Sequence, residues 1–135
     1  MIEKVEITTK KHPQGLKGAP YLKEKGINID DIGKKEVVLF EGTARDAIKG
    51  FPKNVNVSAL LSLAGIGVDK TKVCIMSSTS YKTNIHEVYV KGMFGEMKAC
   101  TSNEVCPANP KTSYLAALSA CAMLTKILSR IKIGT

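Results

Sequence analysis

The sequence predicts an α+β domain in which a mixed, largely antiparallel sheet is covered by helices. Two segments, residues 2–9 and 84–91, alternate apolar and polar side chains with the period of a β-strand. Another segment, residues 56–66, repeats its apolar residues with helical spacing. The last segment, residues 111–130, is apolar on nearly every side, which predicts a long helix buried on more than one face. The length of 135 residues fits one domain, and we expect residues 1–135 to form it.

In the N-terminal half, strand signals flank a turn-rich stretch. The alternation in residues 2–9, IEKVEITT, indicates an exposed or edge strand. Glycines and prolines then predict turns, with one short helix at residues 19–25. Residues 36–41, EVVLFE, are typical of a strand. Thr43 is suited to cap a helix over residues 44–50.

Three strands are expected between residues 72 and 102. They occupy residues 72–76, 84–91 and 96–102. Their short connections predict an antiparallel meander. In the middle strand, strict alternation places His86 on one face together with Val88 and Val90.

Two helices are expected before and after these strands. Asn109 is suited to cap the last helix and Pro110 to occupy its first turn, so this helix runs from residue 111 to about 130. A short IKIG tail follows it. The earlier helix, at residues 56–66, has four apolar side chains on one face, namely Val57, Leu60, Leu61 and Ala64.

The composition argues against several classes of protein. The net charge is +8, but only Arg45 and Arg130 are arginines and tryptophan is absent. Nucleic-acid binders favour arginine and stacking aromatics, so we expect solvated lysine faces and no nucleic-acid partner. The four cysteines form no CxxC pair, so we expect no metal site. No apolar run approaches the ~20 residues of a membrane span, and the N-terminus lacks signal-peptide character, so we expect a cytoplasmic protein without a membrane partner.

Two histidines are candidates for acid–base chemistry. His86 follows a polar run at the start of a strand, and an imidazole with an ordinary pKa of ~6.5 can both accept and donate a proton. A structural role, as a core-facing or hydrogen-bonded surface histidine, is the alternative. His12 precedes a proline in a loop, and for it we expect a structural role.

Two polar clusters precede the predicted helices. Asn54 and Asn56 come just before residues 56–66, where capping explains one asparagine but not both. At the start of the last helix, free amide groups and the helix dipole favour an anion such as a carboxylate, although capping is the simpler explanation. The candidate substrate ligands there are Lys111, Thr112 and Ser113.

Several separated blocks resemble the C-terminal half of archaeal and bacterial L-aspartate dehydrogenases in content, order and spacing. They are FPKNVNVSALLSLAGIG at residues 51–67, the NIHEV block around His86, and NPKTSYLAALSA at residues 109–120, followed by a terminal IKIGT. The strand and helix EVVLFEGTARDAIKGFP also fit that family. The resemblance covers most of the chain.

The resemblance implies a catalytic and dimerisation domain that normally follows a Rossmann domain. His86 matches the family's catalytic histidine, and Asn56 matches an asparagine that contacts the cofactor, NAD or NADP. The implied reaction oxidises L-aspartate to iminoaspartate, which feeds NAD biosynthesis or hydrolyses to oxaloacetate and ammonia. Residues 109–135, the last helix and tail, would pack on the Rossmann domain.

The leading hypothesis is therefore half of an aspartate-dehydrogenase-like oxidoreductase that forms a homodimer. The chain contains no GxGxxG or P-loop motif, so we expect it to be inactive alone and to need a Rossmann domain from another chain. The alternative is a non-enzymatic oligomerisation or regulatory module derived from the same fold.

Overall fold

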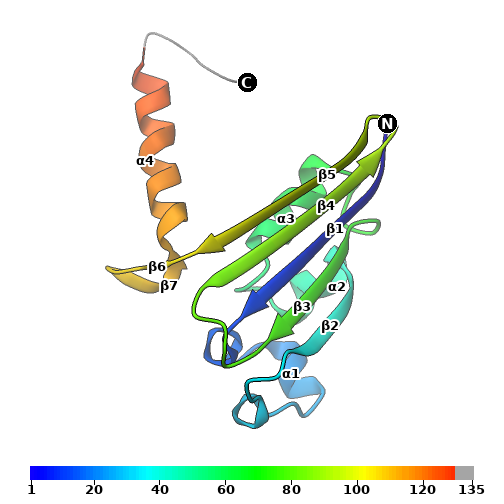
Figure 1. The fold of residues 1–135 in the computed structure, drawn as a ribbon, viewed down its shortest axis with the longest axis vertical. Coiled ribbons are helices and arrows are strands. Elements are labelled where there is room, and N and C mark those ends of the chain that lie inside the picture. Colours follow the sequence, from blue (N-terminus) through cyan, green and yellow to red (C-terminus); the bar gives the residue numbers. More distant parts are fainter. Residues whose placement is uncertain (130–135) are drawn as a thin grey trace. The chain divides into compact units, whose positions relative to one another are not determined.

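The computed structural model describes residues 1–129 and divides the chain into two units, Met1–Ser102 and Asn103–Thr135. The first unit contains the large sheet and three helices, and the second contains a small two-stranded sheet and the last helix (Figure 1). Arg130 and the predicted IKIG tail lie outside the described residues. Within residues 1–129, no helix has the length and apolar character needed to cross a membrane.

The first unit is built on a five-stranded mixed sheet with the order β2-β3-β1-β4-β5. This confirms the predicted α+β class. The central strand β1 pairs in parallel with β3 and antiparallel with β4, while β2 pairs antiparallel with β3. The strands are β1 (Ile2–Lys11), β2 (Val37–Thr43), β3 (Lys72–Ser77), β4 (Asn84–Gly92) and β5 (Gly95–Asn103).

Two predictions about this sheet are wrong. The first strand lies at the centre of the sheet rather than at its edge, and the strands β3, β4 and β5 do not form a meander because β1 separates β3 from β4. The reason is that alternation of side chains reports which side chains face a core. Neither alternation nor a short connection determines which strands are neighbours, and here β1 pairs between β3 and β4.

The register of β1 and β4 sorts their side chains onto two faces. Thr9 pairs with His86, Ile7 with Val88, and Val5 with Val90. Val5, Ile7 and Thr9 are buried. Because side chains alternate along a strand, Glu6, Thr8 and Lys10 lie on the opposite face, which is more exposed.

Helices cover the buried face of the sheet. They are α1 (Pro20–Glu24), α2 (Ala44–Gly50) and α3 (Asn56–Ala64), with two 3-10 turns, η1 (Pro13–Leu16) and η2 (Ile29–Asp31). Their apolar side chains form one core with those of the strands. In it, the rings of Tyr21, Phe40 and Phe51 contact one another with centroids 5.3 to 5.7 Å apart.

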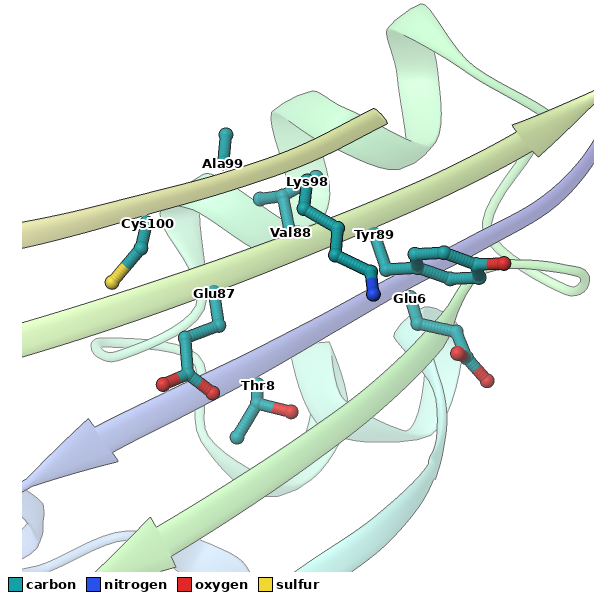
Figure 2. Close-up of a pocket in the computed structure, with 8 residues that line it drawn as sticks. All are labelled: Glu6, Thr8, Glu87, Val88, Tyr89, Lys98, Ala99 and Cys100. Carbon is teal, nitrogen blue, oxygen red and sulfur yellow. The ribbon is translucent and has the colours of Figure 1, made fainter. Parts of the chain in front are cut away.

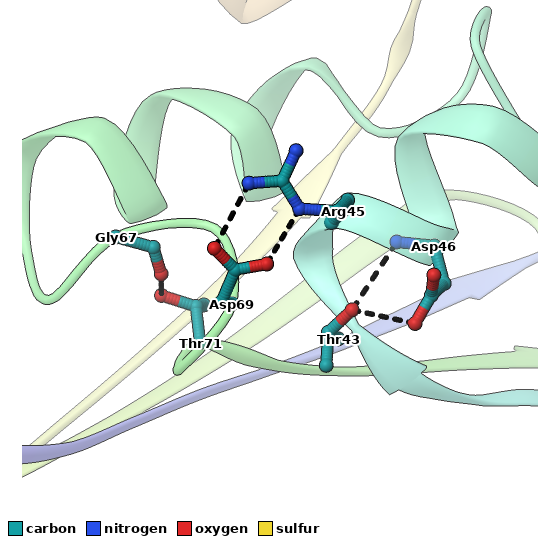
Figure 3. A network of polar contacts seen from close by, with 6 residues as sticks. All are labelled: Thr43, Arg45, Asp46, Gly67, Asp69 and Thr71. Carbon is teal, nitrogen blue, oxygen red and sulfur yellow. Dashed lines mark hydrogen bonds and ion pairs between the residues drawn. The ribbon is translucent and has the colours of Figure 1, made fainter.

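A polar network fixes the start of α2, as Figure 3 shows. The hydroxyl of Thr43 accepts a hydrogen bond from the Asp46 amide and donates one to its carboxylate, which confirms the predicted cap. The guanidinium of Arg45 donates two hydrogen bonds to the Asp69 carboxylate. The backbone of Ala44 also bonds to that of Thr71. The loop before β3 is thereby tied to α2.

Helix α3 buries its small polar side and exposes its apolar side. Ser58 and Ser62 are buried, whereas Leu60 and Leu63 are 69% and 78% exposed. Of the four apolar residues that share a face in the sequence, only Leu61 packs against the core. The first unit therefore leaves an apolar helix surface open.

The second unit consists of β6 (Val105–Cys106), β7 (Asn109–Ser113) and α4 (Tyr114–Leu128). The expected helix start at residue 111, with its cap Asn109 and first-turn Pro110, is wrong because Asn109–Ser113 pairs with β6 as a strand. Ser113 caps the helix instead, accepting a hydrogen bond from the Ala116 amide at 3.2 Å. No residue of α4 is buried.

The difference between core and surface leucines gives a stability prediction. Leu16→Ala removes a fully buried side chain, so we expect the free energy of unfolding to fall by about 2–5 kcal/mol. The same substitution at the 78% exposed Leu63 should change it by less than about 0.5 kcal/mol. Urea unfolding followed by circular dichroism measures both. Equal losses would show that Leu63 is buried in the folded chain.

Candidate functional site

His86 lies at the end of the sheet where β1 and β3 finish and β4 begins. Its Nδ1 is 3.1 Å from the Oγ1 of Thr9, its partner across the two strands. Thr9 is only 2% exposed, so a buried hydroxyl fixes the orientation of the ring. Within residues 1–129, Nε2 of His86 has no hydrogen-bond partner. This nitrogen is therefore available to a substrate.

The surroundings of His86 favour its neutral form. Burial lowers the pKa of His86 below its ordinary value, because a charged imidazolium loses hydration there. The positive charge of Lys11 lowers this pKa further. A neutral imidazole has a free lone pair, so His86 can accept a proton near neutral pH.

Lys11 is the last residue of β1 and lies two residues beyond Thr9. Alternation along the strand places both on the helix-covered face. Burial lowers the pKa of the Lys11 ammonium group. Among the described residues, this ammonium has no ion pair and no side-chain hydrogen bond. The neighbouring Lys10, on the opposite face, bonds to Glu87 at 2.8 Å.

Buried serines fix the loop that leads into β4. Ser77 donates a hydrogen bond to the carbonyl of Lys11 at 2.9 Å, and Ser78 donates one to the carbonyl of Lys34 at 2.7 Å. The amide of Thr79 bonds to the carbonyl of Gly33. The polar run before His86 thus anchors the strand that carries this histidine.

Asn56 is the exposed first residue of α3. Neither Asn56 nor Asn54 caps this helix, because its N-cap is Val55 and no side chain bonds there. Capping therefore explains neither asparagine. Asn54 instead donates a hydrogen bond at 2.7 Å to the carbonyl of Gly15, in the turn that directly follows β1. The start of α3 consequently lies at the same end of the sheet as His86.

The remaining candidates lie elsewhere. His12 accepts a hydrogen bond from the Gln14 amide at 3.3 Å and caps η1, which is the expected structural role. Ser113 caps α4 in the second unit. Lys111 and Thr112 belong to β7, and their side chains lie outside the described part of the structure.

A hollow on the opposite face of the sheet does not include His86 (Figure 2). Two of its lining residues, Glu6 and Glu87, carry carboxylates that would repel an acidic ligand. Lys98 is the one cation in the set. The hollow is lined by Glu6, Thr8, Glu87, Val88, Tyr89, Lys98, Ala99 and Cys100. We therefore place the candidate site at His86.

Thr9 and Lys11 lie on the same face of the sheet as His86, and the sequence prediction missed both. Both belong to a strand about 75 residues before His86, and only the β1–β4 register brings them next to it. In the sequence, both residues belong to the alternating segment IEKVEITTKK. Their polar character on an otherwise apolar face is the signal that could have identified them.

The fold and the site define an α+β domain with a half-buried histidine suited to proton transfer. Residues 1–127 match the family model "Aspartate dehydrogenase, C-terminal". The chain therefore belongs to the aspartate dehydrogenase family, as a C-terminal domain.

Named relatives agree with this family. The chain is 52% identical over 134 residues to an L-aspartate dehydrogenase of Methanosarcina mazei, covering 99% of the chain and 49% of the relative. It is 46% identical to one of Nitrosopumilus maritimus, again covering 99% and 49%. The crystal structure of aspartate dehydrogenase from Thermotoga maritima matches with a TM-score of 0.69 and 28% identity, over 99% of this chain and 48% of that one. The chain spans about half the length of the curated relatives it matches.

The surroundings of His86 predict its titration. We expect a pKa below 6.5, which Lys11→Met should raise because it removes a neighbouring positive charge. Lys10→Met, on the opposite face, should leave this pKa nearly unchanged. NMR titration of the imidazole protons measures each value. A His86 pKa at or above 6.5 in the unmodified chain would contradict the prediction.

The same shift links stability to pH. The unfolded chain, with His86 near 6.5, binds more protons than the folded chain between the two pKa values. The contribution of His86 to stability is thus present above pH 6.5 and is lost as the pH falls through the folded value.

Proposed function

We propose that this chain is the acid–base and substrate-binding half of an L-aspartate dehydrogenase. One observation carries the proposal: His86 is half-buried, held by Thr9 through Nδ1 and free at Nε2, in a chain that matches the C-terminal halves of relatives with that name. A histidine that merely stabilises a core has no need of a free ring nitrogen beside an unpaired lysine.

The proposed reaction oxidises the amine carbon of L-aspartate to an imine, which water then hydrolyses to oxaloacetate and ammonia. His86 Nε2 accepts a proton from the substrate amine or from the water that attacks the imine. Thr9 holds the ring in one orientation throughout. A bound NAD or NADP would supply the hydride acceptor for the amine carbon.

The described residues fit only one end of such a cofactor. Asn56 presents an exposed amide at the same end of the sheet as His86, which suits a contact near the reactive ring. Within residues 1–129, no glycine-rich turn joins a strand to a helix, since β2 continues into α2 at Thr43 and Ala44. We therefore propose that a separate Rossmann domain holds the rest of the cofactor and that this chain is inactive without it.

The exposed apolar surfaces of helices α3 and α4 support the proposal that this chain contacts other protein domains. Leu60 and Leu63 on α3 and Leu124 on α4 are each more than 60% exposed. Apolar surfaces of this kind usually mark contacts with other proteins. We propose that these surfaces are covered by the Rossmann domain, which contacts residues 109–135, and by a second copy of this chain. The assembly would be a cytoplasmic homodimer.

Reconstitution tests the proposed function directly. We expect no aspartate-dependent formation of NADH or NADPH with this chain alone. Activity should appear when the chain is fused behind the N-terminal half of the Methanosarcina mazei L-aspartate dehydrogenase. Turnover by the chain alone would contradict the proposal that a Rossmann domain must complete the cofactor site. A folded but inactive fusion would favour the alternative, a non-enzymatic oligomerisation or regulatory module.

In the active fusion, His86→Asn removes the proposed acid–base group. We expect kcat to fall by about 10²- to 10⁴-fold, the usual contribution of such a group. His12→Asn is the matched control, because His12 caps a turn and an asparagine can cap it as well. Full activity of the His86 variant would remove His86 from the mechanism.

Substitutions at Asn56 and Asn54 should have different effects, one on cofactor binding and the other on stability. Asn56→Ala should raise the KM for the cofactor in the fusion and leave the unfolding free energy of the chain unchanged. Asn54→Ala should instead reduce that free energy by about 1 kcal/mol, since it removes the hydrogen bond to Gly15. Steady-state kinetics and urea unfolding measure the two effects. An unchanged cofactor KM in the Asn56 variant would refute its assignment.

A further inference from the structure

We infer that Lys11 binds a carboxylate of the substrate beside His86. This inference rests on the proposed function, because it names the residue through which that site recognises an acidic substrate.

The position of Lys11 follows from the β1–β4 register. Thr9 contacts the imidazole of His86, and Lys11 is two residues further along the same face, about 7 Å along a strand. A lysine side chain is long enough to span that interval. The charge of Lys11 also acts on the His86 ring, which places the two groups in one local environment.

The partly buried ammonium of Lys11 has no carboxylate partner among the described residues. Burial is the single cause of its lowered pKa, and no carboxylate among residues 1–129 offsets it. The two ion pairs described in the sheet, Lys10–Glu87 and Lys4–Glu6, lie on the opposite face. A buried charge without a counter-ion is unfavourable, so an arriving carboxylate would gain a strong interaction.

The backbone of Lys11 is held in place while its side chain is not. Ser77, itself buried, donates a hydrogen bond to the Lys11 carbonyl. The end of the strand is therefore fixed, and the side chain of Lys11 extends from it on the same face as His86. A dicarboxylate bound there would bring its amine-bearing carbon close to the proton acceptor.

Binding of succinate to the chain as it exists tests the inference without any cofactor. Succinate is a dicarboxylate that cannot react, and its titration should shift the imidazole resonances of His86 in the unmodified chain. Lys11→Met should weaken this binding by about 10- to 100-fold, the usual effect of removing a charge-assisted hydrogen bond. Lys11→Arg should retain most of it, and Lys10→Met should retain all of it.

Kinetics in the fusion give an independent measurement. Lys11→Met should raise the KM for L-aspartate by about 10- to 100-fold and change kcat far less. Its unfolding free energy should stay the same or increase, because the variant removes an unpaired, partly buried charge.

Each possible outcome decides the inference. No succinate shift in the unmodified chain, an equal shift in Lys11→Met, or a destabilised Lys11→Met chain would overturn it. Succinate binding that depends on Lys11 in a fusion that never oxidises aspartate would overturn the proposed function and leave the inference standing. Aspartate oxidation with an unchanged KM for L-aspartate in Lys11→Met would support the proposed function and overturn the inference about Lys11.

Discussion

The central position of β1 is the constraint on which the first unit depends. This strand bonds to β3 on one side and to β4 on the other, so its register sets that of both neighbours. A shift by one residue would turn Thr9 and Lys11 to the open face and bring charged residues into the core. The burial of Val5 and Ile7 opposes such a shift. The same apolar contacts that stabilise the sheet therefore fix the group next to His86.

Charged side chains form ion pairs on one face of the sheet and, among the described residues, none on the other. On the open face, lysines and glutamates pair with each other, as in Lys10–Glu87 and Lys4–Glu6. The exposed pair Lys4–Glu6 contributes little to stability. On the covered face, His86 is favoured as the neutral form and Lys11 has no described partner. The net charge of +8 is thus a poor guide to function. One partly buried lysine matters more than the excess of exposed ones.

Local patterns predicted the local structure well. The helix α2 and its Thr43 cap are confirmed because capping depends on neighbours in sequence. The parallel β1–β3 pairing was missed because it joins segments more than 60 residues apart. The start of α4 was misplaced because Asn109–Ser113 pairs as a strand, which overrides the helix signal. For the site, the polar run before His86 was informative, whereas Thr9 and Lys11 become visible only through the register.

The order of strands has a consequence for how the protein is made. A chain is synthesised from its N-terminus, so β1 is made well before its partners, which begin at Lys72 and Asn84. Both hydrogen-bonding edges of β1 lack their native partners until Lys72–Ser77 has been made, and the edge that pairs with β4 lacks one until Asn84–Gly92 follows. Pairing then closes long loops, which slows folding relative to a simple meander. Such a nascent chain depends on its alternating lysines and glutamates to resist self-association before the sheet closes.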